Sequence, residues 1–437
     1  MNLYILGNGF DLMAGAETTI IKYLGHSKNI DGNNALLEPI SNYVKSNISN
    51  KRLAEKSKKT KIKGNINQLG FWTTLFMLLK DDENIENSKI QTWKNIELYI
   101  FLVTDNVYFD REDDCNELTR HEKQIINTLL DAIFISDQTT VGQKPRLVEQ
   151  RERKEKLTYL YDQLLIFDVQ FAEYLKVISS DSDGATGLSD YAEKVLTNKA
   201  NIWQQHLNST NKSSDKNDDI IFNFNYTTAN YERIKYNNHG VSINTDDGIR
   251  PHEYHVHGTF AQVVRLKPLQ GENIESVPLI FGFDQSNLTD NAVYELNRFT
   301  KTFQLLELKR KDNTLNNFFS KLTTKNEQGI ESTRHIYFIG HSLNESDWSY
   351  FFAIFDNLHL AMRSDLTLHF LFSKEYAESN PGAINAYENS IFKLISAYGE
   401  QLKLIENGSY LMTKLLLNDN LRVEFISLPT IENEFKN

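Results

Sequence analysis

A single cysteine, Cys115, is present among the 437 residues of this sequence. One thiol cannot close a disulfide within the chain or supply a cysteine-rich metal site, which excludes a disulfide-stabilised secreted domain and a zinc finger. The scarcity of cysteine is typical of proteins that work in a reducing, intracellular compartment.

Long hydrophobic runs are also missing. Even the apolar stretch Phe71–Leu79 is much shorter than the ~20 residues that a membrane-spanning helix needs. The N-terminus has no basic segment, and Gly7, Asn8 and Gly9 interrupt its apolar run, so it does not resemble a secretory signal. We therefore expect a soluble, cytoplasmic protein that does not engage a membrane.

Basic residues are fewer than acidic ones: the sequence has 47 lysines and arginines against 58 aspartates and glutamates, and its formal net charge is −11. That balance argues against a protein that coats nucleic acid, and we expect no nucleic-acid partner. The basic run Lys51–Lys63 is the exception. We interpret it as a solvent-exposed loop, with a contact to nucleic acid or to an acidic partner as the alternative.

The first eleven residues predict a strand, a tight turn and the start of a helix. Asn2–Leu6 is apolar, Gly7, Asn8 and Gly9 break the run, and a helix then extends to about residue 25. The N–H groups and the dipole of a helix N-terminus attract anions, and glycine lets a pyrophosphate approach the backbone. Gly-x-Gly is only part of a dinucleotide-binding fingerprint, so a plain turn between strand and helix is the alternative.

The pattern over residues 26–215 predicts helices and then a polar linker. On one helix Trp93, Ile96 and Ile100 share a face, and Glu97 points inward or towards the rim of a cleft. We interpret this part as an all-helical insertion domain, and we expect it to serve partner recognition, gating or contacts in a homo-oligomer.

Beyond the linker, short apolar segments alternate with helical ones, which is typical of a parallel sheet. We therefore predict a Rossmann-like α/β domain of residues 1–25 and 216–437, with the helical insertion, residues 26–215, placed after its first strand and helix. The expected strands are Asn2–Leu6, Ile220–Phe224, Glu253–Val256, Pro278–Phe281, His335–Ile339, Thr367–Phe372 and Arg422–Ile426. The expected helices of this domain include Thr228–Tyr236, Asn291–Leu308, Leu315–Leu322, Asp347–Met362 and Ala383–Leu394.

Small, amide, imidazole or carboxylate groups follow most of these strands. Ligands bind at the carboxyl ends of the strands in an open parallel sheet, so the convergence predicts a binding site at that edge. The candidates are Gly7, Asn8, Gly9, Phe10 and Asp11 after the first strand, Asn225, Tyr226 and Thr227 after the second, His255, His257 and Gly258 after the third, Asp284 after the fourth, and Gly340, His341, Ser342, Leu343 and Asp347 after the fifth.

The histidines allow more than one interpretation. His255 and His257 alternate along a strand and face the same side, so they could be ordinary hydrogen-bonded side chains. Together with His252 and Asp284 they could instead ligate a metal ion. The spacing matches no established metal motif, and we expect no metal.

Two other candidates have plain structural alternatives. Asn225 could cap the helix that follows it or form a local turn. The segment Gly340–Leu343 could be an ordinary turn with Ser342 as a helix cap. It lacks the second glycine of a serine-hydrolase elbow, so we discount that class of enzyme.

Six sequence motifs occur in a characteristic order: ILGNGFDL, WKNIE, FNFNYTT, HVHGTF, IFGFD and FIGHSLNESD. This set resembles the AbiH family, a bacterial family named for abortive infection by bacteriophage. The resemblance implies an anti-phage protein that responds to a phage-derived trigger.

The strand-end loops are also similar, more distantly, to those of sirtuins and sirtuin-like defence proteins. Gly7, Asn8 and Gly9, Asn225–Tyr226, His257–Gly258 and Gly340–Leu343 match elements that surround NAD in those proteins. Two departures are Thr227, where sirtuins have an aspartate, and the segment Asn8–Asp11 in place of Ala-Gly-x-Ser. The zinc-binding cysteines of true sirtuins are absent, so the resemblance implies NAD cleavage rather than protein deacetylation.

The resemblance implies a role for each group. His257 would be the general base, Asn225 would orient the nicotinamide ribose or the attacking water, and Asp11 or Asp284 would stabilise positive charge on the sugar. The NAD-binding groups would be Gly7, Asn8, Gly9, Phe10, Tyr226, Thr227, Gly258, Gly340, His341, Ser342, Leu343 and Asp347.

Two other functions remain open from the sequence. One is a nucleotide-binding sensor without turnover, in which the histidines are structural. The other is an RNA-directed toxin, in which Lys51–Lys63 contacts the RNA and His255 and His257 act as acid and base.

Overall fold

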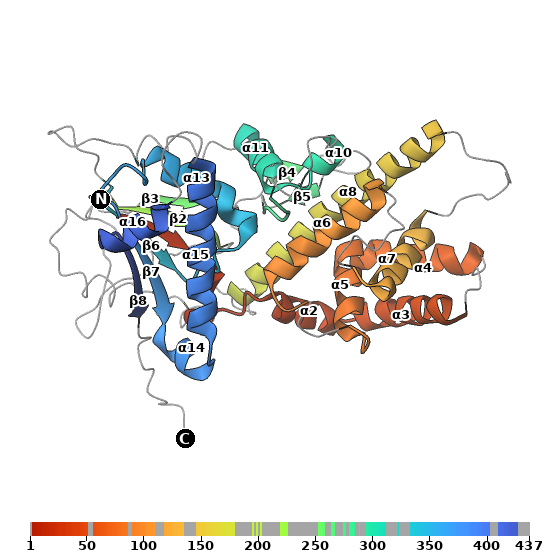
Figure 1. Cartoon of the computed structure of the whole chain (residues 1–437). Coiled ribbons are helices and arrows are strands. Elements are labelled where there is room, and N and C mark those ends of the chain that lie inside the picture. The colour runs from red at the N-terminus through yellow and green to blue at the C-terminus, as the bar shows by residue number, and fades with distance from the viewer. Residues whose placement is uncertain are drawn as a thin grey trace, which may run out of the picture. The chain divides into compact units, whose positions relative to one another are not determined.

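Two compact units make up the chain. The sheet unit comprises Met1–Thr18, Leu175–Ala261 and Leu308–Asn437, and the helical unit comprises Thr19–Tyr174 and Gln262–Glu307. Figure 1 shows the chain as a computed structural model and labels the elements of both units. The structure describes residues 2–50, 56–85, 90–109, 118–134, 146–179, 195, 198–199, 202, 219–225, 252–257, 264–266, 274–276, 279–284, 288, 294–311, 322, 333–402 and 410–426.

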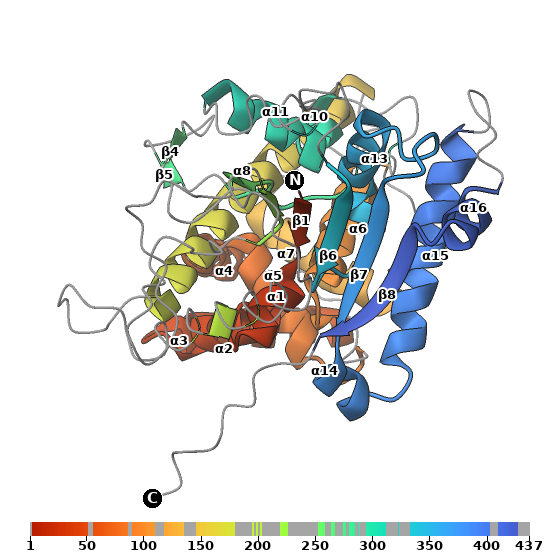
Figure 2. The ribbon, with the colours of Figure 1, turned by 90° about the vertical axis from the view of Figure 1, so that its left-hand side faces the viewer.

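The sheet unit is built on six parallel strands in the order β3-β2-β1-β6-β7-β8. From β1 the chain adds β2 and β3 on one side. It then returns to add β6, β7 and β8 on the other side, and Figure 2 shows these three strands beside β1. The direction of the connections therefore reverses between β1 and β6, and the carboxyl ends of all these strands lie at one edge. The strands are β1 (Asn2–Leu6), β2 (Ile220–Asn223), β3 (His252–His255), β6 (His335–Ile339), β7 (Thr367–Ser373) and β8 (Leu421–Ile426).

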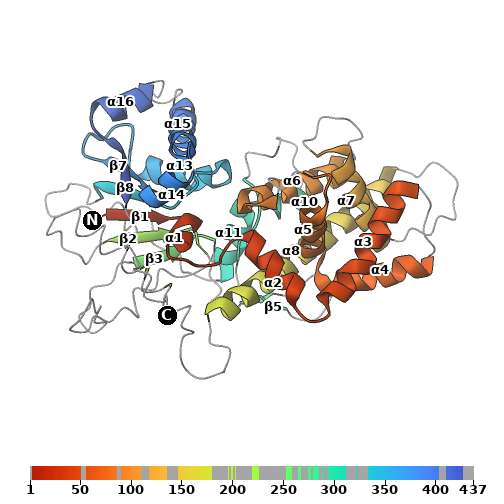
Figure 3. The ribbon, with the colours of Figure 1, turned by 90° about the horizontal axis from the view of Figure 1, so that it is seen from below.

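The sheet is covered on both faces, which is why its central strands are apolar throughout rather than alternating. On one face the ring of Phe338 in β6 lies 5.5 Å from that of Phe351 in α13 (Trp348–Asn357). On the same face Phe370 of β7 lies 6.4 Å from Tyr387 of α15 (Ala383–Leu402), and Figure 3 shows α13 and α15 on one side of the strands. The core of the other face consists mainly of Tyr4, Leu6, Phe10, Ala14, Ile202, Ile221, Tyr337, Ile339 and Leu371.

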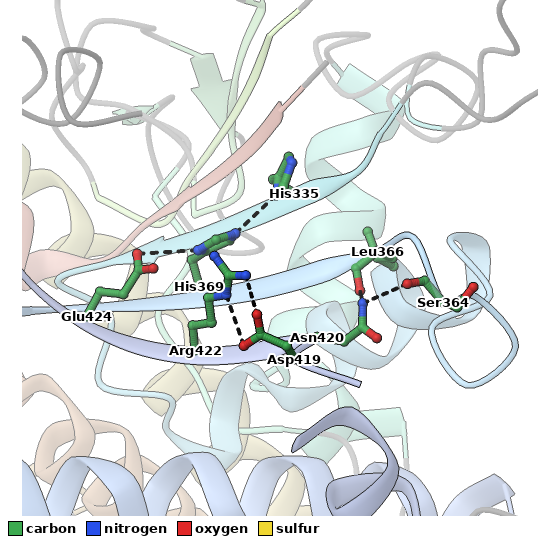
Figure 4. Close-up of polar contacts among 8 residues, drawn as sticks. All are labelled: His335, Ser364, Leu366, His369, Asp419, Asn420, Arg422 and Glu424. Carbon is green, nitrogen blue, oxygen red and sulfur yellow. Dashed lines mark hydrogen bonds and ion pairs between the residues drawn. The ribbon is translucent and has the colours of Figure 1, made fainter. Parts of the chain in front are cut away.

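Polar side chains hold β7 and β8 together at the outer edge of the sheet (Figure 4). His369 of β7 lies between His335 and Glu424 of β8. Nε2 of His369 is 3.0 Å from Nδ1 of His335, and Nδ1 of His369 is 3.3 Å from Oε2 of Glu424. Asn420, just before β8, donates from Nδ2 to two backbone carbonyl groups before β7, at 3.0 and 2.7 Å. These contacts connect three strands of the sheet without any ligand.

The helical unit is centred on α5 (Phe71–Asp81), in which every residue of Phe71–Leu79 is buried. This burial explains the apolar run in the sequence. α7 (Arg120–Ile133) begins with a capping box, in which the side chains of Thr119 and Glu122 satisfy backbone N–H groups. The remaining helices that begin in this unit are α2 (Ile20–Asn29), α3 (Asn33–Asn50), α4 (Lys56–Leu69), α6 (Trp93–Phe109), α8 (Arg146–Ser179), α10 (Tyr294–Asn297) and α11 (Lys301–Lys311). None of the helices that the structure describes is both long and apolar enough to cross a membrane.

The six strands of the parallel sheet begin and end within one residue of their predicted bounds. The predicted strand Pro278–Phe281 is wrong, because the described residues 279–282 form no strand. Gln304 binds this segment instead, since its Oε1 accepts from the N–H of Phe281 at 3.2 Å and its Nε2 donates to the carbonyl of the same residue at 2.6 Å. The antiparallel hairpin of β4 (Val264–Leu266) and β5 (Ile274–Ser276) was not predicted, because strands this short leave no periodic pattern.

The first helix is shorter than predicted. α1 (Asn8–Met13) ends well before residue 25, and Gly15 turns the chain with φ +86°. α2 then begins after Thr19, whose side chain accepts a hydrogen bond from the N–H of Lys22.

The division into units also differs from the predicted domains. Residues 262–307 belong with the helices, and residues 175–215 belong with the sheet. Aromatic contacts explain the first difference, because Phe281 lies 5.1 Å from Trp93 and Phe283 lies 5.1 Å from Phe101, both on α6.

The basic run is a helix rather than a loop from Lys56 onward, while residues 51–55 lie outside the described residues. Ile62 of α4 is buried, and Lys58 and Lys61 are exposed. The lysines therefore form the solvated face of a helix that packs on its other side.

The remaining helix predictions have mixed outcomes. Thr228–Tyr236 lies outside the described residues, and of Leu315–Leu322 only the last residue is described. In place of one helix at Asn291–Leu308 there are two, α10 and α11, and α11 extends to Lys311. α13 and α15 occupy the last two predicted regions.

Candidate active site

The turn after β1 packs directly on the turn after β6. The N–H of Gly7 donates to the carbonyl of Ile339 at 3.0 Å, and the N–H of Gly9 donates to the carbonyl of Gly340 at 2.7 Å. The N–H of Phe10 donates to the carbonyl of Gly7 at 2.8 Å. Three amide groups that we expected to be available for a pyrophosphate therefore already have partners within the chain.

Close backbone packing accounts for the glycines in both turns. A Cβ on Gly7 would lie 2.7 Å from the carbonyl oxygen of Gly340, and a Cβ on Gly9 would lie 2.6 Å from the same oxygen. Gly340 has φ +63°, and a Cβ there would collide with the backbone nitrogen of Phe10. The close approach that requires glycine at these positions is therefore made by another turn of the chain, and ligand binding at Gly7 and Gly9 stays a prediction. Phe10 is a fully buried residue of the core, and its predicted binding role stays a prediction.

We expect Gly340→Ala to destabilise the protein by roughly 2–4 kcal/mol, because it adds both an unfavourable φ and a collision with backbone. Urea unfolding followed by circular dichroism measures this change. Gly25→Ala is the matched control, since nothing lies within 4 Å of its added Cβ. Equal stability of the two variants would contradict the packing role of Gly340.

Asp11 is engaged in a buried ion pair. Its Oδ1 lies 2.6 Å from Nζ of Lys199, and the two side chains are 1% and 3% exposed. The ammonium also lies 5.7 Å from the ring centroid of Phe10. A carboxylate neutralised in this way has a structural role, and its predicted part in catalysis stays a prediction.

Asp347 brings two histidines together at the carboxyl edge of the sheet. Its Oδ1 lies 3.3 Å from Nε2 of His257, and its Oδ2 lies 3.6 Å from Nε2 of His341. All three side chains are less than one tenth exposed. His257 follows β3, His341 follows β6, and Asp347 immediately precedes α13, so three separate elements supply this cluster.

The backbone orients His341. The N–H of Leu343 donates to Nδ1 of His341 at 3.0 Å, which requires a lone pair on that nitrogen. In the neutral ring the proton is then on Nε2, on the side of Asp347; this tautomer is inferred from the hydrogen bond. Leu343 adopts φ +55° to make this contact.

Aromatic rings enclose the cluster. The ring of Phe224 lies edge-on to both histidines, at 5.2 Å from His257 and 4.7 Å from His341. Tyr350 lies 5.9 Å from His257, and Phe351 lies 5.0 Å from His341, both from α13. Such surroundings lower the local dielectric and strengthen the interaction between carboxylate and imidazole.

Asn225 follows Phe224 at the end of β2. Its N–H donates to Oδ1 of Asn223 at 2.8 Å, and its side chain is only 2% exposed. The resulting local turn is made by the side chain of Asn223 and uses only the backbone of Asn225. A turn or helix cap made by Asn225 itself would involve residues 226 onward, which lie outside the described residues.

The other predicted site residues have varied surroundings. Asp284 belongs to the helical unit, where the N–H of the neighbouring Phe283 donates to the carbonyl of Phe299 at 3.2 Å. Ser342 is exposed, Leu343 is buried, and Oδ1 of Asn8 accepts from the hydroxyl of Thr18 at 2.8 Å. Tyr226, Thr227 and Gly258 lie outside the described residues.

The helical unit has a buried ion pair of its own. Oε1 of Glu97 lies 2.7 Å from Nζ of Lys301, and the side chains are 8% and 2% exposed. Glu97 therefore points inward, as one of the two predicted orientations requires. The motifs WKNIE and IFGFD meet in this unit through Trp93 and Phe281, whereas the other motifs contribute to the sheet unit.

Sequence reasoning missed several residues of the site. Lys199 gave no signal, because a lone lysine in a polar region is ordinary. Phe224, Tyr350 and Phe351 look like core residues and act as such. No group of three or more histidine, cysteine, aspartate or glutamate side chains in the described part of the chain could hold a metal ion.

The parallel sheet and the buried histidine–carboxylate cluster at its carboxyl edge define an α/β protein with a candidate acid–base site. Residues 3–368 match the family described as bacteriophage abortive infection AbiH, and the chain belongs to this family. It is accordingly an abortive-infection protein that defends against bacteriophage. No curated protein and no solved structure matches the chain.

Proposed function

We propose that the protein binds NAD at the carboxyl edge of the sheet and hydrolyses its N-glycosidic bond, which releases nicotinamide and arrests the infected cell. The observation that carries this proposal is the buried pair of His257 and Asp347, with 3.3 Å between Nε2 and Oδ1. A histidine held by a carboxylate is suited to accept a proton near neutral pH.

The order of the strands supports a nucleotide as the ligand. Counted along the chain, the six parallel strands lie in the order third, second, first, fourth, fifth, sixth. This is the order of Rossmann-like folds, in which the ligand binds where the connections reverse. Phe224, whose ring contacts both histidines, follows β2, while His257 follows β3 and His341 follows β6, so the cluster takes residues from both sides of β1.

The reaction assigns one task to each group. The bond between ribose C1′ and the nicotinamide nitrogen breaks, nicotinamide leaves with the bonding electrons, and water adds to C1′. His257 takes the proton that the water loses, and Asp347 stabilises the imidazolium that forms. His341 holds Asp347 in place through its other carboxylate oxygen.

Some predicted roles change within this proposal. Asp347, which was predicted to bind NAD, stabilises the imidazolium of His257 instead. Asp11 is paired with Lys199 and is not assigned the stabilisation of positive charge on the sugar. The turn residues Gly7 and Gly9 shape the edge of the sheet, and their N–H groups are not assigned to the pyrophosphate.

The test is to incubate the purified protein with NAD, with and without a phage lysate, and to follow free nicotinamide by chromatography. Release of nicotinamide supports the proposal. Binding of NAD in a thermal-shift assay without release would favour a nucleotide sensor. Absence of both would contradict a nucleotide ligand, and RNA would be the next substrate to test.

A further inference from the structure

Asn225 carries a buried amide group without a partner in the described part of the chain. Its side chain is 2% exposed, and neither Oδ1 nor Nδ2 makes a hydrogen bond there. Native proteins seldom leave both ends of a buried carboxamide unsatisfied, because desolvation without compensation is unfavourable. A ligand that supplies the missing partners would explain the arrangement.

His255 presents a second group of this kind on the neighbouring strand. Its Nδ1 is buried and has no hydrogen-bond partner among the residues described, while its Nε2 lies 3.4 Å from Oε1 of Glu253. A proton on Nε2, facing the carboxylate, leaves a lone pair on Nδ1, and this tautomer is inferred from the contact. Nδ1 is then an acceptor for a ligand hydroxyl or N–H group.

One short network fixes both groups. Nδ2 of Asn223 donates to Oε1 of Glu253 at 2.6 Å, and Oδ1 of Asn223 accepts from the N–H of Asn225 at 2.8 Å. Asn223 and His255 are also register partners of the parallel strands β2 and β3. The same glutamate oxygen therefore contacts His255 and Asn223, and Asn223 in turn sets the backbone of Asn225.

We infer that Asn225 and His255 form a ligand subsite at the carboxyl ends of β2 and β3, and that Asn223 and Glu253 are its positioning residues. The subsite fits a pair of neighbouring hydroxyl groups, such as the cis-diol of a ribose. One hydroxyl accepts from Nδ2 of Asn225 and donates to Nδ1 of His255, and the other donates to Oδ1 of Asn225. That the ligand is a nucleotide rests on the proposed function. The existence of the subsite rests only on the buried, unsatisfied atoms of Asn225 and His255.

The first experiment needs no ligand and compares the same substitution at two positions. Asn225→Leu removes an amide that has no partner among the described residues, so we expect the Tm to rise by about 2–4 °C. Asn223→Leu removes an amide that makes hydrogen bonds to Glu253 and Asn225, so we expect the Tm to fall by at least as much. A lower Tm for Asn225→Leu would show that its amide is satisfied within the protein and would overturn the subsite.

The second experiment measures binding of ADP-ribose by calorimetry. We expect Asn225→Leu and His255→Phe each to weaken binding by about tenfold or more, because each removes a hydrogen bond that a bound hydroxyl would need. Binding that is unchanged in both variants would overturn the subsite. Wild-type protein that binds no ADP-ribose would contradict the proposed nucleotide ligand, while the comparison of Tm values would still decide the subsite.

The positioning role has its own readout. Glu253→Gln keeps an acceptor for Asn223 but removes the charge that faces His255, and Glu253→Ala removes both. We expect a stepwise loss of ADP-ribose affinity in this order, with the Tm of Glu253→Gln close to that of the wild type. Glu424→Gln is the matched control, because Glu424 also contacts a histidine, His369 (Figure 4), but lies on β8, at the opposite end of the strand order from β3. An equal loss of affinity in Glu424→Gln would contradict a specific role for Glu253.

Discussion

Replacing His257 with alanine is expected to lower nicotinamide release from NAD by about 10²–10⁴-fold, the usual contribution of a general base. The imidazole lies 3.3 Å from Asp347 and is almost completely buried, so solvent cannot readily substitute for it. The measurement is the steady-state rate of nicotinamide release, with far-ultraviolet circular dichroism to show that the variant is folded.

His335→Ala is the matched control for this variant. His335 is also a histidine of the sheet, it contacts His369, and it lies at the start of β6 rather than at the carboxyl edge (Figure 4). We expect its rate to stay within a few-fold of the wild type. A folded His257→Ala variant with full activity would exclude His257 as the base, and the other histidine of the cluster, His341, would then be tested.

Lys199→Met is expected to have the largest effect on stability, a loss of about 3–5 kcal/mol. The substitution leaves the carboxylate of Asp11 buried at 1% exposure without its cation, and an unpaired buried charge is strongly destabilising. Urea unfolding measures the loss. The double variant Asp11→Leu, Lys199→Met removes both charges and is expected to regain most of the stability.

Lys28→Met provides a comparison at the same interatomic distance. Lys28 pairs with Asp81 at 2.7 Å, close to the 2.6 Å of the buried pair, but the side chains of Lys28 and Asp81 are each 44% exposed. Exposed ion pairs contribute about 1 kcal/mol or less. If Lys199→Met were no more destabilising than Lys28→Met, the ion pair at Asp11 would not be a structural element of the sheet unit.

Local patterns in the sequence predicted much of the fold. A strand depends on the side chains within it and on the turns at its ends, so β1 and β6 begin and end at the predicted residues. The helical character of the described residues between 26 and 174 was likewise visible as a periodic pattern of apolar residues. Two strand predictions failed for different reasons: Pro278–Phe281 is held by the distant Gln304, and the strands of the short hairpin leave no periodic pattern.

The site was predicted as a set of residues but not as an arrangement. His257, His341 and Asp347 were each named because they follow strands of a parallel sheet, and such loops share one edge. Their contacts could not be predicted, because the sequence does not show which carboxylate faces which imidazole. Asp347 was expected to bind a ligand and instead lies between two histidines.

The sequence by itself determined the parallel sheet, the helical character of the described residues between 26 and 174, and the family, because these depend on local composition and on motifs in order. Only the tertiary structure decided why Gly7, Gly9 and Gly340 are glycines and which cation neutralises Asp11. Both depend on the close approach of segments far apart in the chain. Such an approach is set by the packing of the whole unit, and no local pattern of residues records it.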